Sequence, residues 1–336
     1  MPVIAVDAGG THLRLAVAND DGELRSYARR KISDLHSESN GAEVWESILD
    51  SIAAYVRDAG GGGDTGDAIA FSVPGPVVAR CRLLAAPTIL GARAGPIPDI
   101  AGELHARTGR RVHLINDVSA AAWYLSQRVD AERFFVVTVS SGIGGKLYDR
   151  RHPDRILDTG FAGEIGHIVV DTSPGAPECD CGGRGHLGAI SSGRGTQRLA
   201  RRMARAEPAA FASSRIARQD GAAPDEITNE EHLIPAALEG DAWALCVIRV
   251  AAQPLARVLS ALVAAAGLDR VVAIGGFAQR LGPVYRDVLA TQLVELMGSQ
   301  AFPLFSRGSL TIYDEIEDVC LAGAAAFYRA QCEAVR

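Results

Sequence analysis

The chain has 336 residues, of which 48% are hydrophobic and 22% are charged. These values are typical of a soluble globular enzyme with one large or two ordinary domains. The net charge of −6 argues against a nucleic-acid surface, because phosphate binding requires a concentrated basic patch.

The N-terminus, MPVIAVDAGG, enters a predicted strand directly and lacks the charged start of a signal peptide. The longest apolar run, at 258–268, is too short to cross a bilayer. Four of the six cysteines are isolated, which is typical of reduced thiols. We therefore expect a cytoplasmic protein with no membrane partner.

Strand and helix patterns alternate along the chain, which predicts an α/β protein. A glycine-rich run at 60–66 is interpreted as a helix cap and connector, in preference to a phosphate loop. The predicted strands cover 3–8, 13–19, 68–73, 111–116, 134–140 and 270–276, and the predicted helices cover 41–60, a segment from 117, most of 195–250, and 320–332.

The stretch DAGGTH allows two interpretations. Amides of Gly9 and Gly10 and the hydroxyl of Thr11 suit phosphate oxygens, and Asp7 suits Mg²⁺ bound through water. A hairpin turn, in which the two glycines serve only to adopt positive φ angles, fits equally well. Both interpretations stay open.

The stretch SSGIGGK follows a predicted buried strand and offers Ser141, Gly142 and Gly144 for phosphate contacts. A dinucleotide site is disfavoured, because no GxGxxG pattern opens a helix here. The following KLYDRR resembles a further strand, so a hairpin around phosphate fits better.

In LINDVSAAAW, Asn116 and Asp117 stand where a strand ends and a helix begins. Both residue types are common N-caps, which is one interpretation. The other is that Asp117 acts as general base toward a substrate hydroxyl in phosphoryl transfer.

A metal site is favoured between residues 167 and 186. His167, Cys179, Cys181 and His186 supply two imidazoles and two thiols, the donor set that tetrahedral zinc prefers. Two ordinary surface thiols are the alternative for the CxC pair alone.

In this order along the chain, the motifs resemble the ROK family of sugar kinases and repressors. The resemblance rests on DAGGTHLRLAV, FSVPGPV, LINDVSAAA, VSSGIGG, GEIGH, CDCGGRGHLGAISSG, DRVVAIGGF and CLAGAAAFY.

The resemblance implies two actin-like (ribonuclease H-like) α/β domains flanking a cleft for ATP and sugar. The smaller domain would comprise 1–117 and 318–336, and the larger one, with the zinc loop, would comprise 118–317. A homodimer is expected from the resemblance as well.

The resemblance also implies roles for single residues. Asp117 would be the base, and the stretch from Asp7 to His12 would bind ATP with Mg²⁺. His167 would contact both sugar and a structural zinc. Further contacts would be made to substrate by Pro74, Gly75, Asn116 and Glu164, and to the adenosine side of ATP by Gly275 and Gly276.

The chain departs from the family pattern at four positions. His186 replaces a cysteine, Gly188 replaces a glutamate that usually contacts the sugar, and Thr88 stands where asparagine is common. His12 replaces a lysine, with no effect that we can derive. A site that loses a hydrogen-bonding partner discriminates differently among ligands. A cyclitol or modified sugar is therefore expected in place of plain glucose.

The sequence thus predicts an ATP-dependent carbohydrate kinase. The alternative is a non-catalytic, sugar-responsive regulator. ROK repressors carry a DNA-binding segment before the first phosphate motif, and that motif begins here at Asp7. No nucleic-acid partner is expected.

Overall fold

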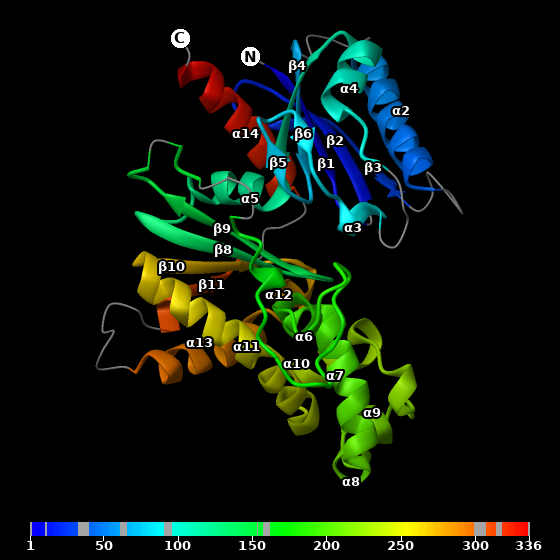
Figure 1. The fold of residues 1–336 in the computed structure, drawn as a ribbon, viewed down its shortest axis with the longest axis vertical. Helices are drawn as coiled ribbons and strands as arrows, with labels where there is room; N and C mark the ends of the chain where they lie inside the picture. The colour runs from blue at the N-terminus through cyan, green and yellow to red at the C-terminus, as the bar shows by residue number, and fades with distance from the viewer. Residues whose placement is uncertain are drawn as a thin grey trace. The chain divides into compact units, whose positions relative to one another are not determined.

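The computed structural model describes residues 2–10, 12–32, 40–60, 66–90, 96–152, 154–156, 162–298, 307–313 and 318–334. The chain divides into two compact units. Unit 1 comprises residues 1–130, 154–162 and 317–336, and unit 2 comprises residues 131–153 and 163–316. Each unit combines a sheet with helices, which confirms the expected α/β class (Figure 1).

Unit 1 contains a five-stranded sheet in the order β3-β2-β1-β4-β7. Strands β1, β2 and β3 form antiparallel pairs, and β4 and β7 extend the sheet in parallel with β1. The elements of unit 1 are β1 (Val3–Ala8), β2 (His12–Ala18), β3 (Leu24–Lys31), α2 (Gly41–Gly60), β4 (Ala68–Val73), β5 (Val77–Val78), β6 (Arg82–Leu83), α3 (Pro87–Leu90), α4 (Ile100–Thr108), β7 (Arg111–Asn116), α5 (Asp117–Leu125) and α14 (Val319–Ala334).

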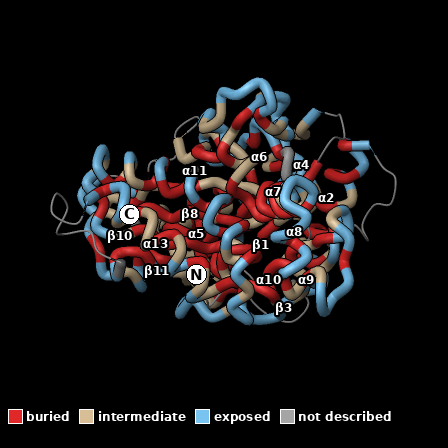
Figure 2. The backbone as a smooth tube through the Cα atoms, turned by 90° about the horizontal axis from the view of Figure 1, so that it is seen from below, coloured by how far each residue is buried: buried red, intermediate tan, exposed pale blue. Residues whose placement is uncertain are grey.

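Helices cover both faces of this sheet. Ile4 and Val6 of β1 belong to the apolar cluster shared with α2 and α4, whereas Val3 and Ala5 belong to the cluster shared with α5 and α14. Successive side chains of a strand point to opposite faces, so a strand buried on both faces is apolar throughout. The tube is accordingly red at β1 in Figure 2.

The predicted bounds of α2 and β4 are confirmed. The Asn40 side chain accepts hydrogen bonds from Ala42 N and Glu43 N and so caps α2. The predicted connector after Gly60 lies mostly outside the described residues, at 61–65. Strand β3 was not expected, because it is largely exposed and carries many charged side chains.

Helix α5 groups with unit 1, although the first domain was expected to end at residue 117. The helix packs against α14, where the rings of Trp123 and Phe327 meet edge to face at 5.3 Å. Gly323 of α14 lies so close to the Ala120 carbonyl of α5 that a side chain would overlap it. The small residues of the C-terminal helix therefore permit this close helix contact.

Unit 2 contains a four-stranded sheet in the order β11-β10-β8-β9. Strand β8 pairs in parallel with β10 and forms a hairpin with β9. The elements of unit 2 are β8 (Arg133–Val139), β9 (Ile143–Asp149), η1 (Ile165–His167), α6 (Leu187–Ser191), α7 (Gly193–Ala206), α8 (Pro208–Ala212), α9 (Arg215–Arg218), η2 (Pro224–Glu226), the π-helical turn η3 (Asn229–Leu233), α10 (Ile234–Leu238), α11 (Ala242–Ala266), β10 (Arg270–Ile274), α12 (Gly276–Leu281), α13 (Pro283–Met297), η4 (Arg307–Ser309) and β11 (Leu310–Ile312).

Helix α11 is long and apolar enough to cross a membrane by length and composition. The apolar run at 258–268 covers only the C-terminal part of this helix and the two residues after it. Val247, Leu255 and Leu259 of this helix are fully buried in the apolar cluster of unit 2. These contacts identify α11 as the central core helix of the unit.

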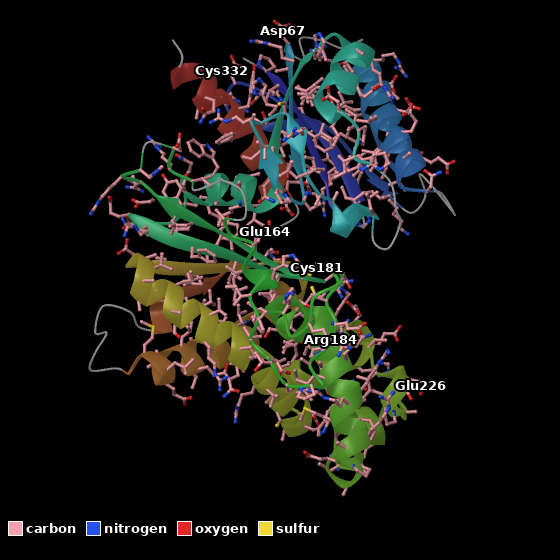
Figure 3. The ribbon with its side chains drawn as sticks, in the orientation of Figure 1. Asp67, Glu164, Cys181, Arg184, Glu226 and Cys332 are labelled. Atoms are coloured by element: carbon pink, nitrogen blue, oxygen red, sulfur yellow. The ribbon has the colours of Figure 1, made fainter. Side chains whose placement is uncertain are left out.

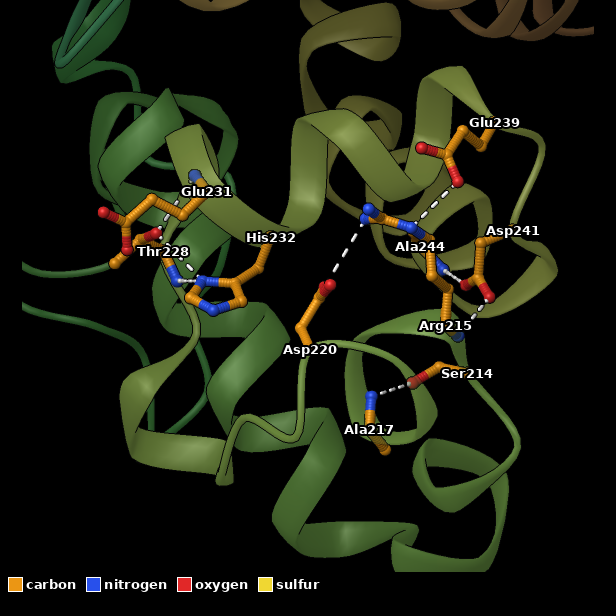
Figure 4. Close-up of polar contacts among 10 residues, drawn as sticks. All are labelled: Ser214, Arg215, Ala217, Asp220, Thr228, Glu231, His232, Glu239, Asp241 and Ala244. Carbon is orange, nitrogen blue, oxygen red and sulfur yellow. Dashed lines mark hydrogen bonds and ion pairs between the residues drawn. The ribbon is translucent and has the colours of Figure 1, made fainter.

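A cluster of ion pairs and hydrogen bonds connects α9 to the N-terminus of α11 in unit 2 (Figure 4). Arg215 at the start of α9 pairs with Asp220 at 3.4 Å and with Glu239 at 2.8 Å. Asp241 accepts hydrogen bonds from Arg215 N and from Ala244 N, both at 2.8 Å. Asp241 therefore caps α11 and holds α9 against it.

Candidate active site and metal centre

In unit 1, Asp7 is held by both strands that neighbour β1. Its register partners are Arg14 on β2 and Ser72 on β4. Arg14 Nη1 donates to Asp7 Oδ2, and Ser72 Oγ donates to Asp7 Oδ1, both at 2.9 Å. Burial raises the pKa of Asp7, while the charge of Arg14 and the hydrogen bond from Ser72 oppose the rise.

Arg14 and Ser72 were missed from the sequence. Strand register was the available signal, because the turn after Asp7 places residue 14 opposite residue 7 in an antiparallel pair. The two contacts fix the orientation of the Asp7 carboxylate.

Replacing Arg14 with Met should destabilise unit 1 by about 2 kcal/mol at roughly pH 7.5, because it leaves Asp7 buried without its cation. In the variant, the pKa of Asp7 lies further above the unfolded value of about 3.9. The folded state then binds more protons than the unfolded state, so stability falls as pH rises above that value. Denaturant unfolding should show a smaller loss at about pH 5 than at about pH 7.5.

Arg25→Met is the matched control, because Arg25 forms an exposed ion pair with Glu23 on the same sheet. It should change stability by less than about 0.5 kcal/mol. A loss for Arg14→Met that is equal at both pH values would contradict the assigned role of the ion pair.

The turn after β1 is a hairpin. Gly9 N donates to His12 O at 2.9 Å, and Gly10 is exposed. His12 Nδ1 lies 3.4 Å from Arg29 Nη2 on β3. Thr11 lies outside the described residues. Phosphate binding by this turn stays a prediction.

Asn116 is the N-cap of α5, and its side chain orients Asp117. Its Oδ1 accepts hydrogen bonds from Val118 N at 3.0 Å and Ser119 N at 3.1 Å. Its Nδ2 donates to Gly75 O and to Asp117 Oδ1, both at 3.1 Å. Asn116 therefore connects the turn that contains Pro74 and Gly75 to the candidate base.

Asp117 itself is only partly buried at the first position of α5. Its Oδ1 also accepts a hydrogen bond from Val118 N at 2.8 Å. This amide and the positive end of the helix dipole therefore both lie at the carboxylate. A carboxylate can accept a proton from an alcohol.

Cys320, from α14, packs against the first sheet and lies within electrostatic range of these carboxylates. Burial raises the pKa of its thiol well above the usual range, the charges of Asp7 and Asp117 add to the rise, and Arg14 opposes it. Cys320 is thus a neutral neighbour of two acidic groups. From the sequence, Cys320 was expected only to be an isolated reduced thiol. Its position near Asp7 could not be predicted, because it depends on the packing of the C-terminal helix against the first sheet.

In unit 2, the hairpin between β8 and β9 forms a tight turn at residues 140–142, here named the phosphate turn after the role expected from the sequence. Ser140 N donates to Gly142 O at 3.0 Å, and Gly144 pairs with Thr138 across the hairpin. The expected strand after this turn is confirmed as β9.

The glycine pair Gly275 and Gly276 follows β10, the parallel neighbour of β8. Gly275 has φ +97°, and a Cβ there would lie 2.7 Å from Val139 O. Only glycine permits this approach. The pair and the phosphate turn therefore lie at the same end of the sheet, where α/β proteins bind ligands.

The four candidate metal ligands converge. Cys179 Sγ lies 3.9 Å from His167 Nδ1, and Cys181 Sγ lies 3.2 Å from His186 Nδ1. All four ligand atoms lie within 4.8 Å of one another. Ligands of a tetrahedral zinc ion lie about 3.6 Å apart, so the donor set and its spacing fit one Zn²⁺.

Residues 179–186, here named the metal loop, form a compact turn. Cys179 N donates to Gly183 O at 2.8 Å, and Gly182 N donates to Cys179 O at 2.9 Å. Residues 169 and 186 form an isolated β-bridge that brings the loop back to the segment after His167. Cys181 and Arg184 of this loop are labelled in Figure 3.

Glu164 precedes the short helix η1 that ends at His167. Its Oε2 lies 3.9 Å from His167 Nε2. The other ring nitrogen of His167 faces Cys179. His167 therefore presents one nitrogen to the metal cluster and the other toward Glu164, which suits the expected double role.

Three comparisons with known proteins show what the whole chain is similar to. A sequence profile of the ROK family matches residues 3–329. The C(7)-cyclitol 7-kinase of Streptomyces hygroscopicus subsp. jinggangensis is 36% identical over 99% of this chain and 95% of its own. The 2-epi-5-epi-valiolone 7-kinase of an Actinoplanes species is 32% identical over 84% of this chain and 80% of its own.

Among solved structures, a ROK family glucokinase from Streptomyces griseus in complex with glucose and AMPPNP superimposes with a TM-score of 0.76. It is 26% identical, over 98% of this chain and 100% of that one. The profile match covers both units, from the strand that carries Asp7 to the helix that carries Cys320. The chain therefore belongs to the ROK family.

Proposed function

We propose that the chain is an ATP-dependent kinase that phosphorylates the C7 hydroxyl of a C7-cyclitol. The observation that carries the chemistry is the Asp117 carboxylate, held at the start of α5 by Asn116 Nδ2 and Val118 N. Two relatives that share most of the chain and are named as 7-kinases of such compounds support the substrate class.

In the proposed reaction, Asp117 accepts the proton of the primary hydroxyl, and the alcohol oxygen attacks the γ-phosphorus of ATP. The bond from this phosphorus to the bridging oxygen breaks, and ADP leaves. Amides and hydroxyls of the phosphate turn, including Ser141, would bind phosphate oxygens. Asp7 would hold Mg²⁺ through water, and the ion would neutralise phosphate charge when it is bound.

Zinc would be structural in this enzyme. His167, Cys179, Cys181 and His186 would close its coordination and leave no position for water. The ion would hold His167 in place, so that Nε2 and the nearby Glu164 carboxylate face substrate hydroxyls. The family resemblance supports two further proposals, that the protein is cytoplasmic and that it forms a homodimer. Light scattering should give the molar mass of two chains if the homodimer is correct.

A substrate screen tests the proposed function. ADP release should be fastest with a C7-cyclitol bearing a free primary hydroxyl, and slower with glucose and N-acetylmannosamine. Turnover of glucose above that of every cyclitol would contradict the substrate class. Tight cyclitol binding without ADP release would favour the non-catalytic regulator.

Gly188 supplies a prediction about specificity. A Cβ at this position would lie 3.2 Å from Gly166 O, so a side chain fits with a small shift. The substitution Gly188→Glu introduces the carboxylate that the family pattern usually carries at this position. We expect the ratio of kcat/KM for glucose to that for cyclitol to rise about tenfold.

Gly188→Ala is the control for this prediction, because it adds the Cβ without the carboxylate. It should leave the ratio within about twofold of the original value. If the Glu and Ala variants shift the ratio equally, the carboxylate has no role in specificity.

A further inference from the structure

Arg194 connects the metal loop to the phosphate turn within unit 2. Its Nη2 pairs with Asp180 Oδ2 at 2.7 Å, and its Nε donates to the Ser141 carbonyl at 2.8 Å. Asp180 stands between the candidate ligands Cys179 and Cys181. One guanidinium thus joins two segments that are about forty residues apart in sequence and are proposed to bind different ligands.

The helix that carries Arg194 is packed directly on the phosphate turn. Gly193 N donates to Ser140 O at 2.8 Å, and a Cβ on Gly193 would lie 3.0 Å from the same oxygen. Ser192, the N-cap of α7, and Thr196 in its first turn are fully buried. The backbone of α7 therefore holds the turn at Ser140, whereas the Arg194 side chain holds it at Ser141.

The metal loop has backbone hydrogen bonds of its own, which are made by Cys179, Gly182 and Gly185. The side chains of Asp180 and Arg194 are 61% and 55% exposed, so their ion pair depends on where the loop backbone places Asp180. Because both sequence neighbours of Asp180 are candidate ligands, a bound ion would fix this backbone on both sides. Loss of the ion would remove this restraint on the backbone at Asp180.

We propose that Arg194 is a positioning residue through which metal occupancy sets nucleotide affinity. With the ion bound, Asp180 holds the guanidinium in place, and Arg194 Nε fixes the Ser141 carbonyl and with it the phosphate turn. Without the ion, Arg194 loses this support and the turn becomes less ordered. The inference rests on the proposed function, because it assigns nucleotide phosphates to the turn.

Equilibrium binding of ADP, measured by calorimetry, tests the coupling. Removing the metal with a chelator should weaken ADP binding to the unaltered protein by about fivefold, which is the size expected for one partly exposed charged contact. Arg194→Ala should weaken binding by a similar factor with the metal present, and chelation should then have no further effect. The KM for the polyol should stay unchanged in this variant.

Arg198→Ala is the matched control, because Arg198 lies one turn further along α7 and donates to Ala189 O at 2.9 Å. Arg198→Ala should bind ADP as tightly as the unaltered protein does, and chelation should weaken its ADP binding by the same factor. If chelation weakens ADP binding equally in the unaltered protein and in Arg194→Ala, the inference is overturned. It is also overturned if neither chelation nor Arg194→Ala changes the affinity for ADP.

The metal-loaded protein offers a second test, which holds even if chelation unfolds the metal loop. Asp180→Asn should weaken ADP binding about as much as Arg194→Ala does, and the double variant should lose no more than either single one. Additive losses would overturn the inference. A protein that binds no ADP and phosphorylates no polyol would instead contradict the proposed function.

Discussion

Asp117→Asn is expected to lower turnover by about a thousandfold while leaving ligand binding largely intact, because general-base catalysis is typically worth this much. Asparagine keeps the shape of the side chain and an oxygen that can accept from Val118 N and Asn116 Nδ2. It cannot accept the proton of the substrate hydroxyl. Steady-state kinetics together with ADP and polyol binding would measure the two effects separately.

Asp50→Asn provides the control for this experiment. Asp50 lies on α2 and forms an exposed ion pair with Arg107 in the same unit, far in sequence from the proposed base. Its loss should change turnover by less than about twofold. Turnover near normal in Asp117→Asn would remove Asp117 from the mechanism, whatever the substrate.

Loss of a metal ligand should have the second large effect. Cys181→Ser should release the zinc and lower the unfolding temperature by about 10 °C, since binding of a structural metal adds directly to the free energy of folding. Metal analysis of the purified protein and calorimetric unfolding would measure both. Cys246→Ser, at an exposed free cysteine on α11, should change neither.

The unusual ligand His186 allows a finer test. His186→Cys should retain the ion, because zinc accepts thiolate as readily as imidazole, whereas His186→Ala should lose it. Less than about half an equivalent of zinc in the unaltered protein would count against four-ligand coordination. Equal metal content in the Cys and Ala variants would exclude His186 as a ligand.

Local patterns in the sequence determined the strands that carry the site and the donor set of the metal centre. The turn after β1 and the hairpin around Ser141 follow from short-range backbone preferences of glycine. Asn116 and Asp117 were recognised because a strand-to-helix junction selects capping residues. Two thiols and two imidazoles within twenty residues indicate zinc from ligand chemistry alone.

Only the tertiary structure decided which distant side chains surround these groups. Arg14 and Ser72 reach Asp7 through strand register, and Cys320 reaches it through the packing of α14. Arg194 meets both Asp180 and Ser141 because α7 begins against the phosphate turn. Such contacts depend on long-range packing, which the periodicity and local spacing of the sequence do not encode.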